Sequence, residues 1–149
     1  MSINYERVAL DDLRTHPYRE AALENLRERI AALQAQAEGI KVQAADAVPV
    51  QGGASSVEDR LINNILERER LKLNYLAVKP LVNIVRRGLS ALTDEERTIL
   101  ERFAQDGRRG DRTADILSEE LHMSRAGVYR REAEALKKFT VVCYGITEL

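Results

Sequence analysis

The stretch Thr113–Phe139, TADILSEELHMSRAGVYRREAEALKKF, decides how the rest of the chain is interpreted. Thr113 can cap a short helix, His122 and Met123 interrupt the helical pattern, and Ser124 is a good N-cap for a second helix. The apolar residues expected on the buried sides of these two helices are Leu117, Leu121, Val128, Ala135 and Leu136. A short helix, a tight turn and a longer basic helix predict a helix-turn-helix, whose second helix enters the DNA major groove.

The second helix of this motif has an outward face suited to DNA. At about 100° per residue, the residues that point away from Val128 are Ala126, Tyr129, Arg130, Ala133 and Lys137. Small residues permit close approach, while Arg130 or Arg125 can make a bidentate contact with guanine. Tyr129 can donate to a phosphate or pack on a thymine methyl group. The alternative is a helical hairpin whose charges are simply solvated.

Other basic residues around the motif are better placed to hold phosphates than to read bases. These expected phosphate anchors are Arg108, Arg109, Arg112, Arg131 and Lys137. The full set of predicted DNA-binding residues is Ser124, Arg125, Ala126, Tyr129, Arg130, Arg131, Lys137, Arg112, Arg108 and Arg109. Residues 124–138 carry five basic and two acidic side chains, whereas the whole chain has a net charge of −1. The net charge of −1 argues against a non-specific nucleic-acid coat protein.

A capping box marks the helix that precedes the motif. In Thr93-Asp-Glu-Glu96 the threonine hydroxyl can accept from the amide of Glu96, whose carboxylate reaches back. We therefore expect a helix from Asp94, with Ile99, Leu100 and Phe103 facing inward. The predicted helix-turn-helix domain covers residues 92–149. Within it, the apolar spacing favours continued helix through residues 139–146, although their β-branched content leaves a short strand as the alternative.

The N-terminal half of the sequence predicts two long helices. Residues 18–38 form an amphipathic helix, preceded by a shorter one around Tyr5–Arg14, with Pro17 at the first turn and Gly39 at the end. The seam residues of this helix are Leu23, Leu26, Ile30, Leu33 and Ala37. The expected N-terminal segment is therefore 1–39, followed by a flexible linker over 40–56, for which an ordered surface loop is the alternative.

The second long helical segment covers residues 57–91, and Pro80 predicts a kink or break near Val78–Lys79. Its apolar stripe comprises Ile62, Ile65, Leu66, Leu73, Leu76, Leu81, Ile84, Val85 and Leu89. Two such stripes exceed what a helix-turn-helix can cover, so we expect a homo-oligomer formed through the long helices. A hairpin within one chain is the alternative.

The segment Leu92–Phe139 resembles region 4 of bacterial sigma factors, with LT-x-EER-x-IL, then Thr113, EEL-x-x-S and V-x-x-x-x-x-x-ALKK. Residues 57–146 as a whole resemble the ArpU/RinA-type phage transcriptional regulators, through the VYR of Ser124–Arg130, the ALKKF run and Tyr144-Gly145. The resemblance implies an all-α fold, with long N-terminal helices before a sigma region-4-like helix-turn-helix. It also implies a phage-encoded regulator of transcription that binds double-stranded DNA, with RNA polymerase as a further partner.

Three positions depart from the pattern of these relatives. Ser118 stands where such motifs usually have alanine, and His122 replaces the usual turn glycine, which commonly adopts a left-handed conformation. Arg131 falls where an aliphatic residue normally packs. We expect it to snorkel, to pair with Glu134 or Glu120, or to contact phosphate.

The remaining signals point to no catalytic chemistry. Cys143 lies in an apolar run and is interpreted as a buried structural thiol, and His16 and His122 lack neighbouring metal ligands. With no catalytic constellation, leader or membrane span, we expect a cytoplasmic protein that is not an enzyme and uses no cofactor. The resemblance to phage regulators implies that this cytoplasm is that of a bacterial host cell. Two functions compete with transcription regulation: a helical protein-interaction module and a small-terminase-like DNA-packaging adaptor.

Overall fold

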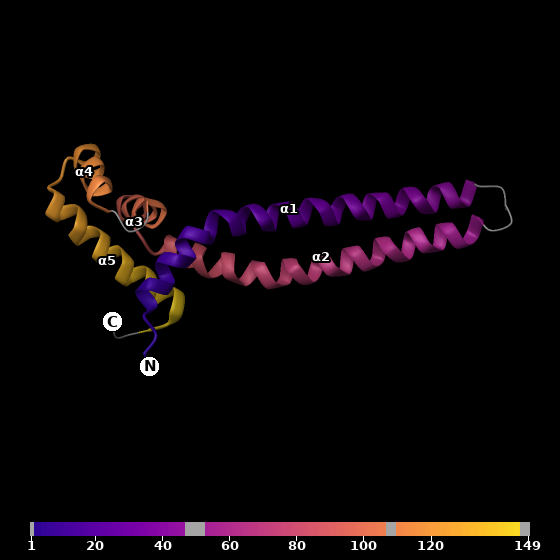
Figure 1. The fold of residues 1–149 in the computed structure, drawn as a ribbon, viewed down its shortest axis with the longest axis horizontal. Coiled ribbons are helices and arrows are strands. Elements are labelled where there is room, and N and C mark those ends of the chain that lie inside the picture. Colours follow the sequence, from indigo (N-terminus) through magenta and orange to yellow (C-terminus); the bar gives the residue numbers. More distant parts are fainter. Residues whose placement is uncertain (1, 47–52, 107–109, 147–149) are drawn as a thin grey trace. The chain divides into compact units, whose positions relative to one another are not determined.

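The computed structural model of the chain is all-α, which confirms the expected fold class, and it describes residues 2–46, 53–106 and 110–146. Within those ranges the elements are α1 (Tyr5–Asp46), α2 (Gly53–Ser90), α3 (Asp94–Asp106), α4 (Gly110–Leu121) and α5 (Arg125–Tyr144) (Figure 1). No helix in this part of the chain combines the length and the apolar character needed to cross a membrane.

The chain divides into two compact units. Unit 1 comprises residues 1–18 and 81–149, and unit 2 comprises residues 19–80. This division differs from the predicted one, because the first turns of α1 and the last turns of α2 belong with the C-terminal helices. The reason is burial: Ala9 of α1 and Leu89 of α2 are 0% and 3% exposed in the same core cluster as α5.

The main core of unit 1 is assembled from four helices. Its buried members are Ala9, Leu13, Val85, Leu89, Leu100, Ala104, Ala135, Leu136 and Phe139. Gly88 lies so close to α5 that a Cβ atom there would overlap the side chains of Phe139 and Cys143. Burial raises the pKa of the Cys143 thiol to about 11, and its Sγ donates to the Ile84 carbonyl at 3.5 Å. Cys143 is therefore a half-buried, unreactive thiol.

A second core in unit 1 joins α3, α4 and α5. Its buried residues are Ile99, Phe103, Ala114, Leu117 and Val128. The capping box is confirmed: the Glu96 amide donates to Thr93 Oγ1, and the Thr93 amide donates to Glu96 Oε1, each at 3.2 Å. Helix α5 continues to Tyr144 and ends at Gly145 in the left-handed conformation (φ 66°). The described part of residues 139–146 is thus helix through Tyr144, as favoured, and not a strand.

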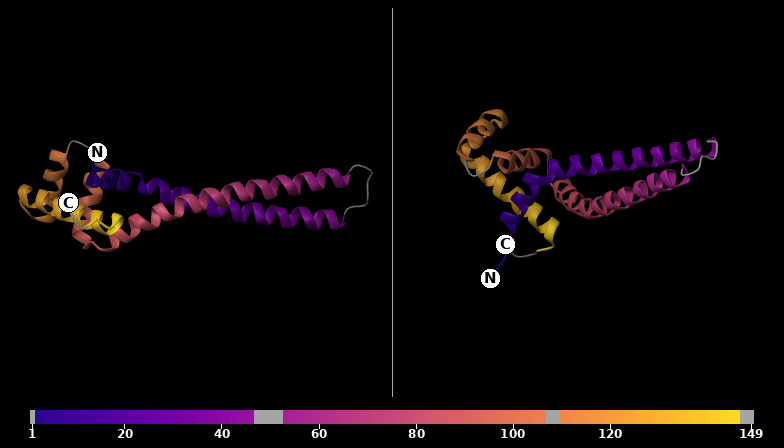
Figure 2. Two further views of the ribbon diagram at one scale, coloured as in Figure 1. Left: turned by 90° about the horizontal axis from the view of Figure 1, so that it is seen from below. Right: turned by 45° about the vertical axis from the view of Figure 1, so that its right-hand side comes forward.

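Unit 2 is a helical hairpin in which α1 and α2 lie antiparallel, side by side in both views of Figure 2. The buried apolar residues between them are Leu23, Leu26, Ala37, Ile40 and Leu71. Asn64 is also buried, and its amide donates to the Leu33 carbonyl at 2.8 Å while Arg68 donates to its Oδ1 at 2.8 Å. The hairpin within one chain is therefore correct for the α1 seam.

Three helix boundaries differ from the sequence expectations. Helix α1 does not begin at Pro17 or end at Gly39, but runs from Tyr5 to Asp46. The reason at the second position is that Ile40 continues the buried seam at 4% exposure, so packing compensates for the glycine. Residues 40–46 and 53–56 of the predicted linker are helical. The remaining linker residues, 47–52, lie outside the described part.

Helix α2 passes through Pro80 without interruption, so of the two outcomes expected there, a kink or a break, the break is excluded. Proline removes one backbone donor, but the helix is held by burial on both sides, by Leu71 in unit 2 and by Val82 in unit 1. Pro17 and Pro80 both lie within two residues of a boundary between the two units.

Candidate nucleic-acid interface

Helices α4 and α5 are joined by a three-residue turn. His122 adopts a left-handed conformation (φ 53°), a backbone that a glycine would adopt at lower cost. Ser118 stabilises this turn, because its hydroxyl donates to the Met123 carbonyl at 2.6 Å. The serine that stands in place of the usual alanine therefore fastens the end of α4 to the turn.

Ser124 caps α5 as predicted. Its backbone is extended (φ −68°, ψ 154°), and its hydroxyl accepts from the Gly127 amide at 3.0 Å. The cap fixes where α5 begins, so Arg125 and Ala126 lie in its first turn. The Ser124 hydroxyl is thus used by the cap, and Ser124 acts on its neighbours by positioning the start of the helix.

Thr113 does not cap α4, which begins three residues earlier at Gly110. The threonine is 2% exposed, and its hydroxyl donates to Asp106 Oδ2 at 2.6 Å. Local preferences favour Thr113 at a cap, but its hydrogen bond to Asp106 at the end of α3 holds it inside α4. The two arginines expected nearby, Arg108 and Arg109, lie outside the described residues.

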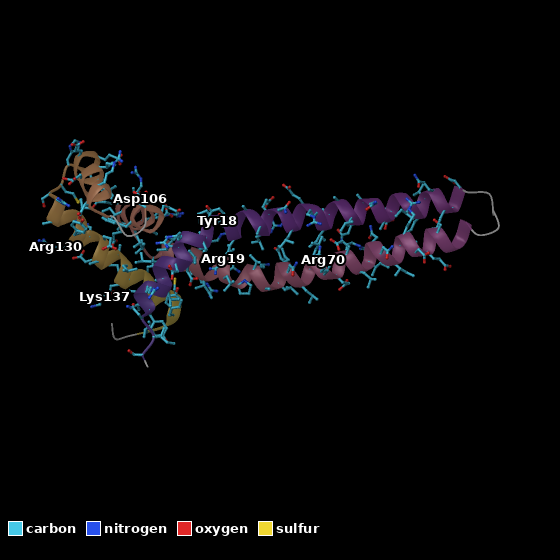
Figure 3. The ribbon with its side chains drawn as sticks, viewed as in Figure 1. Tyr18, Arg19, Arg70, Asp106, Arg130 and Lys137 are labelled. Carbon is cyan, nitrogen blue, oxygen red and sulfur yellow. The ribbon has the colours of Figure 1, made fainter. Side chains whose placement is uncertain are left out.

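The outward face of α5 has the composition that the helical spacing predicted. Its residues are all exposed: Ala126, Tyr129, Arg130, Ala133 and Lys137. Figure 3 shows Arg130 and Lys137 on the same side of α5, the side turned away from α3. Neither of them, nor the exposed Arg112 of α4, forms a hydrogen bond or ion pair with any other residue that the structure describes. These three cations are available to an external anion.

Arg125 and Tyr129 are engaged by a carboxylate from α4. Arg125 Nη2 lies 3.0 Å from Asp111 Oδ1, and the Tyr129 hydroxyl donates to the same oxygen at 2.7 Å. These contacts, the Tyr129 hydrogen bond foremost, lower the pKa of Asp111, and the same hydrogen bond raises the pKa of Tyr129. Arg125 also approaches Asp115, with Nε 3.6 Å from Oδ1. Two of the predicted base readers are thus occupied in the isolated chain.

The basic residues on the flank of α5 pair with the start of α3. Arg131 Nη1 lies 3.3 Å from Glu95 Oε1, so its partner is neither Glu134 nor Glu120. Lys138 Nζ donates to Glu96 Oε2 at 2.9 Å, and this bond lowers the pKa of the buried Glu96 carboxyl. Lys138 was not among the predicted site residues. Lys138 binds the glutamate of the capping box, Glu96. The capping box was the one sequence signal for a carboxylate held in place near α5.

Comparison of the chain with protein-family models, with curated proteins and with solved structures found no match. The resemblance to sigma region 4 and to ArpU/RinA-type regulators accordingly stands on the quoted residues alone. The site is interpreted below from its own geometry.

Proposed function

We propose that this protein is a sequence-specific DNA-binding regulator of transcription that places the N-terminal half of α5 in the major groove of double-stranded DNA. One observation carries the proposal: Arg130 is exposed and without a described partner, on a face flanked by the small residues Ala126 and Ala133. A long cation between two small side chains allows the helix backbone to approach base edges closely. A phage origin and a role beside RNA polymerase in the bacterial cytoplasm follow from the resemblance.

Of the three proposed contacts, one reads a base and two hold phosphates. Arg130 lies in the second turn of α5 and reads a guanine through a bidentate contact. Lys137 follows seven residues later, about 10 Å along the helix, and Arg112 lies on α4, so both hold phosphates. Arg125 and Tyr129 join the interface when DNA phosphates displace the Asp111 carboxylate from them.

One observation favours a second candidate, a helical module that binds RNA polymerase or another protein. Arg125, Arg131 and Lys138 are each paired with carboxylates of α3 or α4, which weakens the positive potential of the motif. A protein-binding surface tolerates such neutralisation, whereas phosphate binding depends on free cations.

The test begins with selection from a random duplex library, since the proposal requires a preferred sequence. Binding of the full chain to the selected duplex is then measured at several salt concentrations. Arg130→Ala should weaken binding by about 1–3 kcal/mol and abolish discrimination at one base pair. Arg7→Ala, which removes the same charge from an exposed position of α1, is the matched control.

Lys137→Ala gives a different signature in the same assay. It should weaken binding to all duplexes alike and reduce the slope of log affinity against log salt by about one phosphate contact. If selection yields no preferred sequence, or if both variants bind the selected duplex as the wild-type chain does, α5 is not a reading helix. The interaction module would then be the better account.

A further inference from the structure

Two consecutive glutamates at the start of α3 bind two cations on one flank of α5. Arg131 Nη1 lies 3.3 Å from Glu95 Oε1, and Lys138 Nζ lies 2.9 Å from Glu96 Oε2. Arg131 and Lys138 are seven residues apart, which places them on the same flank of α5, about 10 Å apart along its axis. These two ion pairs, which we call the clamp, therefore attach α5 to α3 at two points.

The carboxylate that binds Lys138 is itself held in place. Glu96 is 3% exposed, and its other oxygen, Oε1, accepts from the Thr93 amide at 3.2 Å. A buried carboxylate requires such partners, and its bonds, that from Lys138 foremost, keep the pKa of Glu96 below its ordinary value. Glu96 is therefore ionised at neutral pH, and it ties Lys138 to a fixed point in the first turn of α3.

Each cation of the clamp directly follows a residue of the proposed DNA interface. Arg131 follows Arg130, and Lys138 follows Lys137. Neighbouring residues of a helix are about 100° apart around its axis, so a cation that is bound to α3 fixes the direction of the residue before it. Figure 3 shows Arg130 and Lys137 on the side of α5 that is turned away from α3, as this geometry requires.

The rotation of α5 about its axis matters for recognition. A rotation of about 20° moves an atom about 6 Å from the axis by about 2 Å, enough to break a hydrogen bond to a base edge. Hydrophobic attraction in the cores of unit 1 is not directional, whereas a charged hydrogen bond depends on the direction of its donor. The clamp thus adds the directional contacts that define one rotation of α5.

We propose that Glu95 and Glu96 are positioning residues for DNA recognition. Through Arg131 and Lys138, the clamp fixes the rotation of α5 at which Arg130 faces the major groove. The inference rests on the proposed function of α5, and it explains why cations of a DNA-binding motif are paired with carboxylates of α3. The rival account is that Glu96 merely occupies Lys138, a phosphate anchor, until DNA displaces the carboxylate.

Glu96→Gln separates the two accounts by the sign of its effect. The glutamine keeps an oxygen for the Thr93 amide but loses the charge that holds Lys138. If the clamp positions α5, binding of the full chain to the selected duplex should weaken by about 3- to 30-fold. Discrimination at the base pair that Arg130 reads should also fall. Under the rival account, Lys138 is freed, so binding should strengthen and its salt dependence should steepen, which would overturn the proposal.

Glu101→Gln is the matched control, because it removes the same charge from the surface of α3, where the carboxylate pairs with Arg97. Loss of an acidic charge by itself favours binding to DNA, so this variant should not weaken binding. Glu95→Gln should weaken binding less than Glu96→Gln does, since the Glu95 side chain is 39% exposed. Weakening by Glu101→Gln equal to that by Glu96→Gln would overturn the proposal.

Lys138→Met completes a double-mutant cycle with Glu96→Gln. Because the two side chains act as a pair, the double variant should bind about as weakly as either single variant, whereas independent contributions would add. Circular dichroism at the temperature of the binding assay shows whether each variant is folded. A smaller folded fraction would weaken binding to all duplexes alike, so the fall in base discrimination reports on positioning and not on stability.

The outcomes separate this inference from the proposed function. If the wild type selects a duplex and Glu96→Gln binds it as tightly, or more weakly but with full discrimination, the clamp does not position α5 and the proposed function stands. A wild-type chain that selects no duplex would overturn both proposals.

Discussion

The two units of this protein are stabilised in different ways. In unit 1 several helices converge, so that Phe139 and Leu100 are 0% exposed and polar groups from one helix bond to the end of another. In unit 2 two helices meet along a single seam, and ion pairs run along one helix, as between Glu67 and Arg70 at 2.6 Å. Each helix of a two-helix hairpin buries one side only, so apolar residues on the other side of α2, such as Leu66 and Leu73 at 61% and 68% exposure, remain uncovered.

The largest effect is expected when a central side chain is removed from the main core of unit 1. Phe139 is fully buried between α2 and α5, and Phe139→Ala should lower the free energy of unfolding by about 3–5 kcal/mol. Urea denaturation followed by circular dichroism measures this change. Val142→Ala removes a side chain that is 47% exposed on the same helix, and it should cost less than about 0.5 kcal/mol. Similar losses for the two variants would contradict the assignment of Phe139 to the core.

A substitution in unit 2 should lower the free energy of unfolding by less, and the side chain concerned is polar. Asn64 is 5% exposed; its amide donates to the Leu33 carbonyl across the hairpin seam, and its Oδ1 accepts from Arg68 of the same helix. Asn64→Ala should lower the free energy of unfolding by about 1–2 kcal/mol, while Asn64→Leu, which restores an apolar seam, should be neutral or stabilising. Asn74→Ala, at an exposed position of α2, is the control. A leucine variant as unstable as the alanine variant would show that the seam requires the amide.

How far the sequence predicts this fold depends on whether a signal is local. The capping box at Thr93 and the N-cap at Ser124 were predicted correctly, because each involves neighbouring residues. The glycine signal at Gly39 was misleading, because packing against a helix that is distant in sequence outweighs a local preference.

Periodicity has a related limit in α2. Both sides of this helix carry apolar residues at helical spacing, so the pattern predicts faces without saying which face is inside. The stripe predicted from the sequence included Leu66 and Leu73, which lie on the exposed side, whereas Leu71 lies on the buried one. In the candidate site, the outward position of Arg130 followed from helix geometry alone. The pairing of Lys138 with Glu96, 42 residues away, depends on packing that no local pattern encodes.

The Glu96 carboxyl, which is buried in unit 1 and bound by the exposed Lys138, predicts an acid dependence of stability. Bonds from Lys138 and Thr93 hold the folded pKa of Glu96 below the ordinary value of 4.5. This carboxylate therefore contributes stability above pH 4.5, and the contribution is lost as the pH falls through its lower folded pKa. The urea midpoint of the wild type should fall more steeply below pH 4.5 than that of Glu96→Gln. Glu101→Gln, whose carboxylate pairs with Arg97 at the surface, should keep the wild-type slope.

The smallest expected effect concerns the contact that occupies two predicted readers in unit 1. Asp111 is highly exposed, and one of its oxygens binds both Arg125 and Tyr129. If DNA phosphates must displace it, Asp111→Asn should strengthen binding to the selected duplex by about two- to fivefold, since exposed ion pairs are weak. The salt dependence should also steepen, because Arg125 becomes free to release a counterion on binding. Glu119→Gln removes the same charge from an exposed position of α4 and controls for the change in overall field.

Weaker binding by Asp111→Asn would show the opposite role, in which the carboxylate holds Arg125 and Tyr129 in the geometry that DNA requires. Equal strengthening by both variants would show that only the net charge matters, and Arg125 and Tyr129 would then have no special part in recognition.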